Sequence, residues 1–378
     1  MNDMFYKTEY CLKYKDTVVF KFNIQKQTIT MIDASLLPIS LQNKNYNFDL
    51  VRTFCADRIL MLNREYCKEI LTACGIDDQS DVNICIVCKG LSFRDNYWIS
   101  KARSRETWKD VNLYENKFSL DISRVALTGN MQGISIDDAV SDKIFTGELT
   151  SKGTRAKCYY RSGTDLLLYK HESIEEIMSE MITYYIALAL SVPCSEYKIQ
   201  RLFDRECSVC KILTSERYEL VPCRDVMSHF NKTTLRYDED VYATFMKVDA
   251  VNFIKMQILD YVTLNTDRNR DNFGLLRVDG KLCGLYPLFD HDSCFKGKST
   301  NGIYFPTGTT FAETLKLLKS MPQYREISEC IRNFKEVTAS QPFKALYLQY
   351  KSLEEYNSML KRVNNLDGLR PLMPSRSF

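Results

Sequence analysis

The sequence of 378 residues lacks three features that would assign it to a membrane, an export route or a nucleic acid. It contains no run of 18 apolar residues, so no membrane span is expected. Its N-terminus, MNDMFYKTEYCLKYK, has no apolar signal core, so we expect a cytoplasmic protein. Lysine and arginine exceed aspartate and glutamate by 51 to 48, and a net charge of +3 gives no electrostatic reason to expect direct nucleic-acid binding.

Internal repeats and low-complexity tracts are absent as well, which leaves an ordinary globular composition. Hydrophobic residues make up 45% of the chain and aromatic residues 12%, enough for folded cores. A chain of this length exceeds one compact core, so we expect two or three domains.

Fourteen cysteines are scattered along the chain and include two CxxC pairs, Cys85/Cys88 and Cys207/Cys210. Zinc-binding CxxC pairs usually lie about 12–20 residues apart, whereas these pairs are separated by 119 residues. Both pairs are surrounded by apolar, β-branched residues, which predicts strands with residues three apart on opposite faces. Reduced, buried thiols are favoured over zinc or redox chemistry.

The first 145 residues mix strand-like runs with one helix. The strand-like runs lie at 16–24, 27–32 and 82–91, and the helix lies near 64–76, with Gly75 as its C-cap. A polar stretch at 134–157 is predicted to be a linker into a new unit.

The pattern changes at about residue 146. Strand candidates at 156–163 and 165–170 are joined by a Ser-Gly turn, which predicts a hairpin. A helix follows from Ser173, which forms a capping-box pattern with Glu176, and apolar residues then recur with a helical period until Pro193.

The remaining chain is mostly helical after two more strands. Strands are expected at 207–215 and 216–222, a strand and turn at 285–295, and helical patterns at 242–265, 311–321 and 343–366. This order predicts a small β-rich lobe followed by a larger helical lobe, with a cleft between them.

The stretch TLNTDRNRDNFGLL, residues 263–276, concentrates charged and amide side chains between apolar segments. Phosphoryl transfer from ATP needs a carboxylate for the attacking hydroxyl, oxygen ligands for magnesium and a lysine on the phosphates. Asp267 suits the first role, Asn272 and Asp290 the second, and Lys170 the third. Solvated turns are also rich in Asp and Asn, so the residues alone leave a polar turn as an alternative.

A glycine turn before the first hairpin strand is a second candidate element. In TSKGTRAKCYY, residues 150–160, Gly153 would let backbone N–H groups approach phosphate oxygens. A glycine before a strand also marks an ordinary turn, which remains the alternative.

Several segments together resemble the HipA-like kinases. NTDRNRDNFG, followed 23 residues after Asp267 by LFDHDS, resembles their loop, roughly N-x-D-x-H-x-x-N-F, and their metal aspartate. Residues 91–119 are similar to the S-L-x-D-x-Y-W-I … W-x-x-V-N-L-F-E-N segment of Firmicutes-type HipA-like proteins, and 55–71 is similar to their N-terminal helical segment. The resemblance covers about residues 25–320.

The resemblance implies an α+β, bilobal protein-kinase-like fold with an additional N-terminal α/β region. The expected domains are an N-terminal HipA-like region at 1–145, a kinase N-lobe with the phosphate loop at 146–225, and a helical C-lobe with the catalytic loop and metal site at 226–378.

The resemblance also assigns site residues. It implies that Asp267 is the catalytic aspartate and that Asn272 and Asp290 bind Mg²⁺. Lys170 would contact ATP and pair with Glu180, for which Glu176 is the alternative acid. The remaining implied positions are Gly153, Thr154 and Lys157 in the phosphate loop, Leu213 and Glu216 at the adenine hinge, and Thr150 or Ser151 as the hydroxyl for autophosphorylation.

Two features fit this assignment less well. Asn269 stands where the family has histidine, and asparagine cannot carry a proton. Glu180 lies nearly opposite the apolar face of its helix, so periodicity alone predicts a solvent-facing side chain, which an acid facing the cleft would also satisfy.

The leading functional hypothesis is a serine/threonine protein kinase that uses ATP and Mg²⁺ and phosphorylates a protein substrate or itself. The alternatives are a lipid or small-molecule kinase and a nucleotide-binding regulator, or pseudokinase, that acts through a partner. HipA-like proteins are often toxins held by a small DNA-binding antitoxin, which makes such an antitoxin a candidate partner.

Overall fold

The computed structural model describes residues 8–77, 80–117, 119–134, 146–232, 239–265, 267–296 and 319–366. The chain forms two compact units: Met1–Glu172 with Ile199–Val221, and Ser173–Lys198 with Pro222–Phe378. In these described ranges, no helix combines the length and the apolar composition needed to cross a membrane.

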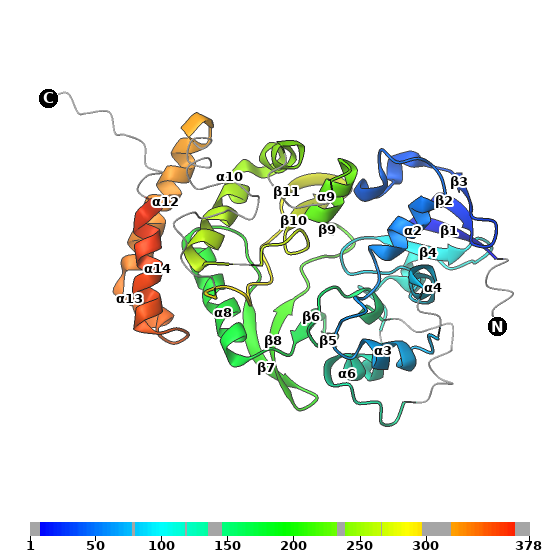
Figure 1. The fold of residues 1–378 in the computed structure, drawn as a ribbon, viewed down its shortest axis with the longest axis horizontal. Helices are drawn as coiled ribbons and strands as arrows, with labels where there is room; N and C mark the ends of the chain where they lie inside the picture. The colour runs from blue at the N-terminus through cyan, green and yellow to red at the C-terminus, as the bar shows by residue number, and fades with distance from the viewer. Residues whose placement is uncertain are drawn as a thin grey trace. The chain divides into compact units, whose positions relative to one another are not determined.

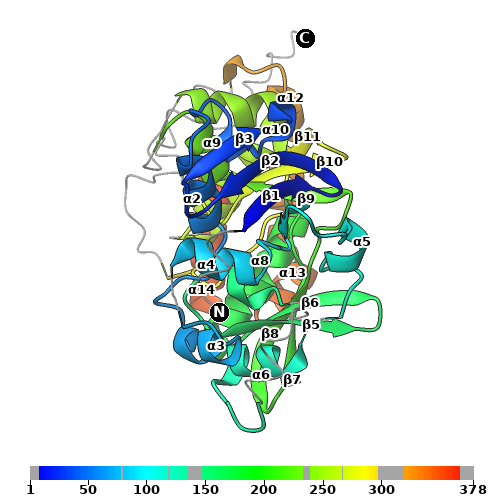
Figure 2. The ribbon, with the colours of Figure 1, turned by 90° about the vertical axis from the view of Figure 1, so that its right-hand side faces the viewer.

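The first unit begins with an antiparallel sheet of strand order β3-β2-β1-β4 (Figure 2). Its strands are β1 (Glu9–Tyr14), β2 (Thr17–Asn23), β3 (Thr28–Met31) and β4 (Tyr97–Lys101). Tyr10, Cys11 and Leu12 of β1 are buried in succession, and because successive side chains of a strand point to opposite faces, both faces of the sheet are covered there. The predicted strands at 16–24 and 27–32 are confirmed.

Short helices of the first unit share a hydrophobic core with this sheet. They are α2 (Asp49–Ala56), α3 (Cys67–Ala73), α4 (Asp81–Val87) and α6 (Leu120–Thr128), and α5 (Trp108–Val111) joins a smaller cluster around Trp98. The described part of this unit also has the 3₁₀ turns η1 (Ala34–Leu36) and η2 (Ile39–Leu41), between β3 and α2, and η3 (Glu148–Thr150), after α6. Helix α3 is the helix predicted near 64–76, and Gly75 follows it with a φ of 65°.

The run 82–91 is predicted as a strand, but residues 82–87 belong to helix α4 and a turn follows. Its N-terminus is capped, because the Ser80 hydroxyl accepts a hydrogen bond from the Asn83 N–H. Cys85 and Cys88 are both buried, and they lie one helical turn apart rather than on opposite faces of a strand. Packing of the helix against the core thus outweighs the strand propensity of its β-branched residues.

The second sheet has the strand order β5-β6-β8-β7. Its strands are β5 (Lys157–Ser162), β6 (Asp165–Lys170), β7 (Tyr197–Leu202) and β8 (Arg205–Lys211). The predicted β5–β6 hairpin is confirmed, with Lys157 opposite Lys170 and Ser162 opposite Asp165. Strand β8 carries Cys207 and Cys210, which are buried as predicted, and β9 (Tyr218–Pro222) follows.

The second unit is mainly helical. Its helices are α8 (Ile174–Ala189), α9 (Cys223–His229), α10 (Glu239–Thr263), α12 (Tyr324–Ala339), α13 (Gln341–Tyr347) and α14 (Leu353–Asn365), and β10 (Gly274–Val278) pairs with β11 (Lys281–Leu285) as an antiparallel hairpin (Figure 1). Helix α8 has the predicted capping box of Ser173 and Glu176. The helix predicted at 311–321 lies largely outside the described residues.

Helix α10 corresponds to the predicted helix at 242–265 but contains a kink that the sequence pattern did not indicate. Asp249 leaves the helical conformation, with φ −158° and ψ 76°. Its carboxylate accepts hydrogen bonds from the N–H groups of Asn252 (3.1 Å) and Leu285 (3.0 Å). Asp249 therefore caps the part of α10 that follows the kink and links it to β11 by a hydrogen bond.

The division into two units differs from the predicted boundaries at residues 145 and 225. Leu149, Cys158 and Val209 belong to the same hydrophobic core as β1 and β2, so the N-terminal region and the strands of the second sheet form one unit. The prediction of a linker at 134–157 is wrong for its described part around η3, because Glu148 and Ser151 are buried there. The three predicted domains remain a prediction.

Candidate functional site

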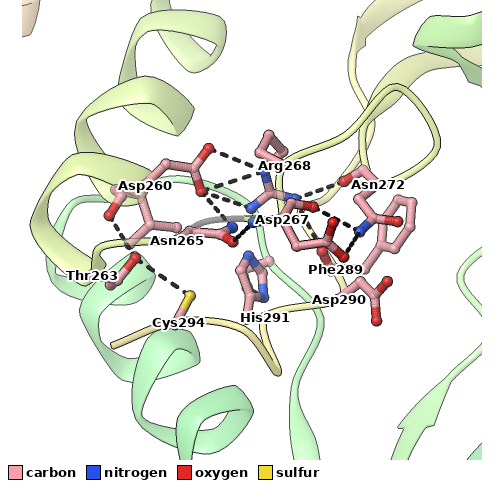
Figure 3. A network of polar contacts seen from close by, with 12 residues as sticks. Asp260, Thr263, Asn265, Asp267, Arg268, Asn272, Phe289, Asp290, His291 and Cys294 are labelled. Atoms are coloured by element: carbon pink, nitrogen blue, oxygen red, sulfur yellow. Dashed lines mark hydrogen bonds and ion pairs between the residues drawn. The ribbon is translucent and has the colours of Figure 1, made fainter. Parts of the chain in front are cut away.

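The predicted catalytic loop follows α10 and is built from hydrogen bonds between short polar side chains. The Asp267 N–H donates to Asn265 Oδ1 (3.0 Å), and Asp267 Oδ1 accepts from Asn269 Nδ2 (3.0 Å). Asn272 Nδ2 donates to the Asp267 main-chain oxygen (2.9 Å) and to Asp267 Oδ2 (3.2 Å) (Figure 3). Asp267 and Asn272, paired in the sequence hypothesis, are in direct contact.

Arg268 organises this loop, although sequence reasoning gave it no role. Its side chain is buried and forms an ion pair with Asp260 of α10 at 2.9 Å. The same guanidinium donates to the carbonyl oxygens of Asn272 (2.6 Å) and Phe289 (3.0 Å). One side chain therefore joins the end of α10, the loop and the residue that precedes Asp290 (Figure 3).

The charge on Arg268 is secure despite its burial. Burial opposes the charge, but the Asp260 carboxylate outweighs it and raises the pKa of Arg268. One feature of the sequence could have indicated this ion pair: Asp260 lies within the apolar run ILDYV. A buried acid needs a buried cation or hydrogen-bond donors.

Asp290 lies at the end of the chain segment that follows β11. Its backbone is left-handed, with φ 63°, and its N–H donates to the Tyr197 hydroxyl at 3.0 Å. Non-glycine residues adopt this conformation rarely, and they are concentrated at functional sites. Figure 3 shows Asp290 in the same neighbourhood as Asn272 and Asp267.

Asn272 and Asp290 carry the amide and carboxylate oxygens that Mg²⁺ prefers as ligands. Asn272 Nδ2 donates its hydrogen bonds to Asp267, so the Asn272 amide oxygen is not used in this contact. No group of three or more His, Cys, Asp or Glu side chains among the described residues is arranged to hold a metal. A site of one amide and one carboxylate remains suitable for Mg²⁺, which completes its shell with water and phosphate oxygens.

The predicted phosphate-loop residues form one tight turn before β5. Gly153 has a φ of 93°, which side chains other than glycine rarely adopt. A Cβ atom at this position would lie 2.4 Å from Lys157 Nζ, which folds back over the turn and donates to the Lys152 carbonyl at 2.6 Å. Thr154 is exposed in the same turn.

The two predicted autophosphorylation residues precede this turn and are buried. Thr150 Oγ1 donates to the carbonyl oxygens of Leu91 (2.8 Å) and Gly147 (3.1 Å). Phosphate transfer to Thr150 or Ser151 would therefore require the segment to leave this position. Autophosphorylation at these residues stays a prediction.

Lys170 and Glu180 belong to different units, and their pairing stays a prediction. Lys170 is buried at the end of β6, and its Nζ lies 3.5 Å from Glu172, an acid that sequence reasoning missed. Glu180 is fully buried, so the interpretation of helix periodicity as leaving it in solvent is wrong. Helix α8 buries a polar stripe beside its apolar face, formed by Glu176, Ser179, Glu180 and Thr183.

Glu176, the alternative acid for Lys170, has other partners. Its Oε2 accepts from the Ser173 N–H and hydroxyl, and its Oε1 forms an ion pair with Lys296 at 2.9 Å. Burial alone would raise the pKa of Glu176, but the bonds from Lys296 and Ser173 lower it to about 2. The choice of Glu180 over Glu176 as the partner of Lys170 stays a prediction.

The low pKa of Glu176 predicts a pH-dependent contribution to stability. An ordinary glutamate titrates near 4.5, so the contribution is complete above that pH and disappears as the pH falls toward 2. We expect Glu176→Gln to lower the free energy of unfolding by roughly 1–2 kcal/mol at pH 7, since water screens the half-exposed Lys296.

Urea unfolding at pH 7 and pH 3 measures this difference, which should shrink at the lower pH. Glu329→Gln, at an exposed ion pair with Arg325, is the matched control with a small effect at both pH values. An equal loss at pH 7 and pH 3 would assign the effect of Glu176→Gln to packing rather than to charge.

The predicted adenine hinge is held by the region that resembles HipA-like proteins at 91–119. Asn96 Nδ2 donates to the Glu216 carbonyl and Trp108 Nε1 to Glu216 Oε1, both at 3.1 Å. Thr214 Oγ1 donates to the Phe93 carbonyl. Leu213 is exposed, and the role of the segment as a hinge stays a prediction.

Comparisons with known proteins identify the fold. No family model and no curated protein matches the sequence. Among solved structures, the chain is similar to HipA of Shewanella oneidensis MR-1, taken from a complex of toxin–antitoxin HipA and HipB with operator DNA. The TM-score is 0.58 at 11% identity, and the match covers 96% of this chain and 99% of that one.

A second solved structure, the proinflammatory kinase CtkA of Helicobacter pylori, matches with a TM-score of 0.40 and 17% identity, over 55% of this chain and 89% of that one. The match to HipA confirms the predicted resemblance at the level of the fold: the chain is an α+β protein with the HipA-like, kinase-like fold.

Proposed function

We propose that the chain is a cytoplasmic protein kinase that uses ATP and Mg²⁺ to phosphorylate serine or threonine. One observation supports this most: Arg268 donates to the carbonyl oxygens of both Asn272 and Phe289. The loop with Asp267 and the residue before Asp290 are thereby held by one buried group. The HipA-like fold across nearly the whole chain is consistent with this chemistry.

Each site residue would have a separate task in the reaction. Asp267, exposed at its loop, would orient the attacking hydroxyl and accept its proton. Asn269 donates to Asp267 Oδ1 and so fixes the rotamer of that carboxylate without adding a titratable group. Asn272 and Asp290 would hold magnesium, which neutralises phosphate charge when bound. Lys170 would contact the phosphates, oriented by Glu180.

The test is incubation of the purified chain with γ-labelled ATP, with Mg²⁺ or with EDTA, alone and with generic protein substrates. We expect label on serine or threonine that depends on Mg²⁺. ATP binding without transfer would instead support the nucleotide-binding regulator, which Asn269 in place of histidine favours. Label confined to lipid or to a small molecule would support the third hypothesis.

A partner is proposed by analogy alone. The similar HipA structure contains HipB and operator DNA. A small DNA-binding antitoxin is therefore the candidate partner of this chain, beside its protein substrate. Contact with nucleic acid would be made by the antitoxin, because a net charge of +3 gives the chain itself little attraction for DNA.

A further inference from the structure

The glycine turn at 149–157 is bound by residues 57–65, which lie between α2 and α3 and which we call the N-terminal brace. The Leu60 N–H donates to the Leu149 carbonyl (2.7 Å), and the Glu65 N–H donates to the Thr154 carbonyl (2.8 Å). Glu65 Oε2 accepts from the Ala156 N–H at 3.2 Å. The brace thus binds backbone groups at the start, in the middle and near the end of the turn.

Arg64 links the two ends of the turn. Its side chain is fully buried. One terminal nitrogen donates to the Glu148 carbonyl at 3.0 Å, and the other donates to the Lys157 carbonyl at 2.5 Å and lies 3.4 Å from Glu148 Oε2. Glu148 in turn accepts the Tyr159 N–H at 2.7 Å. The planar guanidinium therefore fixes the distance between the chain entering and the chain leaving the turn.

Such a brace matters because a glycine turn is intrinsically mobile. Glycine has many accessible backbone conformations, and Gly153 must be held near φ 93°. Restricting it costs conformational entropy before the N–H groups can align on phosphate oxygens. Residues that restrict a binding loop in advance raise affinity by lowering the ordering cost of binding. The brace restricts the turn in this way, because most of its hydrogen bonds are to backbone atoms of the turn.

We propose that Arg64 and Glu65 are positioning residues for the phosphate loop and set its affinity for the phosphates of ATP. The inference rests on the proposed function, because it takes the turn at 149–157 as the phosphate-binding element. It adds a role for a segment outside the predicted kinase lobes. The brace acts through the backbone of the turn and not through the transferred phosphate.

Glu65→Ala is the first variant, and because Glu65 is exposed we expect the variant to fold. We expect the KM for ATP to rise about tenfold with kcat nearly unchanged, the size of one lost hydrogen bond to a charged group. Hydrogen exchange without nucleotide should be about tenfold faster at the Ala156 amide. Glu69→Ala, which removes an acid in the first turn of α3, should change neither value.

Arg64→Lys is the second variant. Lysine keeps the charge beside Glu148 but cannot bridge Glu148 and Lys157 with a planar group, so the KM for ATP should rise further. If wild type transfers phosphate and both variants keep the wild-type KM and exchange rates, the inference fails and the proposed function stands. If wild type neither binds nor uses ATP, the proposed function fails and takes the inference with it.

Discussion

Asp267→Asn should reduce phosphoryl transfer by roughly 10²–10⁴-fold, the range expected for loss of a general base. The carboxylate is exposed and receives side-chain hydrogen bonds from Asn269 and Asn272, so it is held in one orientation. Asparagine has the same shape but cannot take a proton from a hydroxyl. Steady-state kinetics should show the loss in kcat, with little change in ATP affinity.

Asp271→Asn is the matched control for this prediction. Asp271 lies in the same loop and forms an ion pair with Arg224, outside the proposed chemistry. We expect transfer within a few-fold of wild type for this variant. Retention of wild-type kcat by a folded Asp267→Asn protein would remove Asp267 from the mechanism.

Arg268→Met should destabilise the protein by about 3–5 kcal/mol, the usual result when one member of a buried ion pair is removed. The substitution leaves the Asp260 carboxylate buried without its cation and deprives the Asn272 and Phe289 carbonyls of their donor. Chemical denaturation followed by circular dichroism measures the change. Transfer activity should fall with stability, because the same group holds the loop.

Two variants separate this effect from a general cost of losing arginine. Arg325→Met removes an exposed i,i+4 pair and should cost about 0.5 kcal/mol or less. The double variant Asp260→Leu/Arg268→Met should be more stable than Arg268→Met alone, since no unpaired charge is buried. Equal stability of the single and double variants would show that the ion pair is not the cause.

The local elements with strong sequence signals were predictable. Ser173 and Glu176 marked the start of α8, and the Ser-Gly turn marked the β5–β6 hairpin, because capping and turn chemistry depend on neighbouring residues. The contact of Asp267 with Asn272 was predictable for the same reason, since they lie five positions apart in one loop.

The features that sequence reasoning missed depend on residues far apart in the chain. Helix α4 carries strand-favouring residues and is helical because its buried face meets the core. Glu180 departs from the apolar period of α8 and is nevertheless buried. In the sequence, Arg268 is one charged residue of a polar loop, and its contacts with Asp260 and Phe289 form only in the folded chain. Periodicity registers hydrophobicity and carries no information about such polar partners.

The kink in α10 marks the start of a helical segment that has an anchoring acid at each end, Asp249 and Asp260. Asp249 binds the N–H of Leu285, and Asp260, eleven residues later, holds the arginine that binds the Phe289 carbonyl. The helical segment that begins after Asp249 and includes Asp260 spans about three turns. Inserting or deleting one residue between them would swing one acid by about 100° away from its target. The number of residues between the two acids must therefore be kept for both contacts to form together.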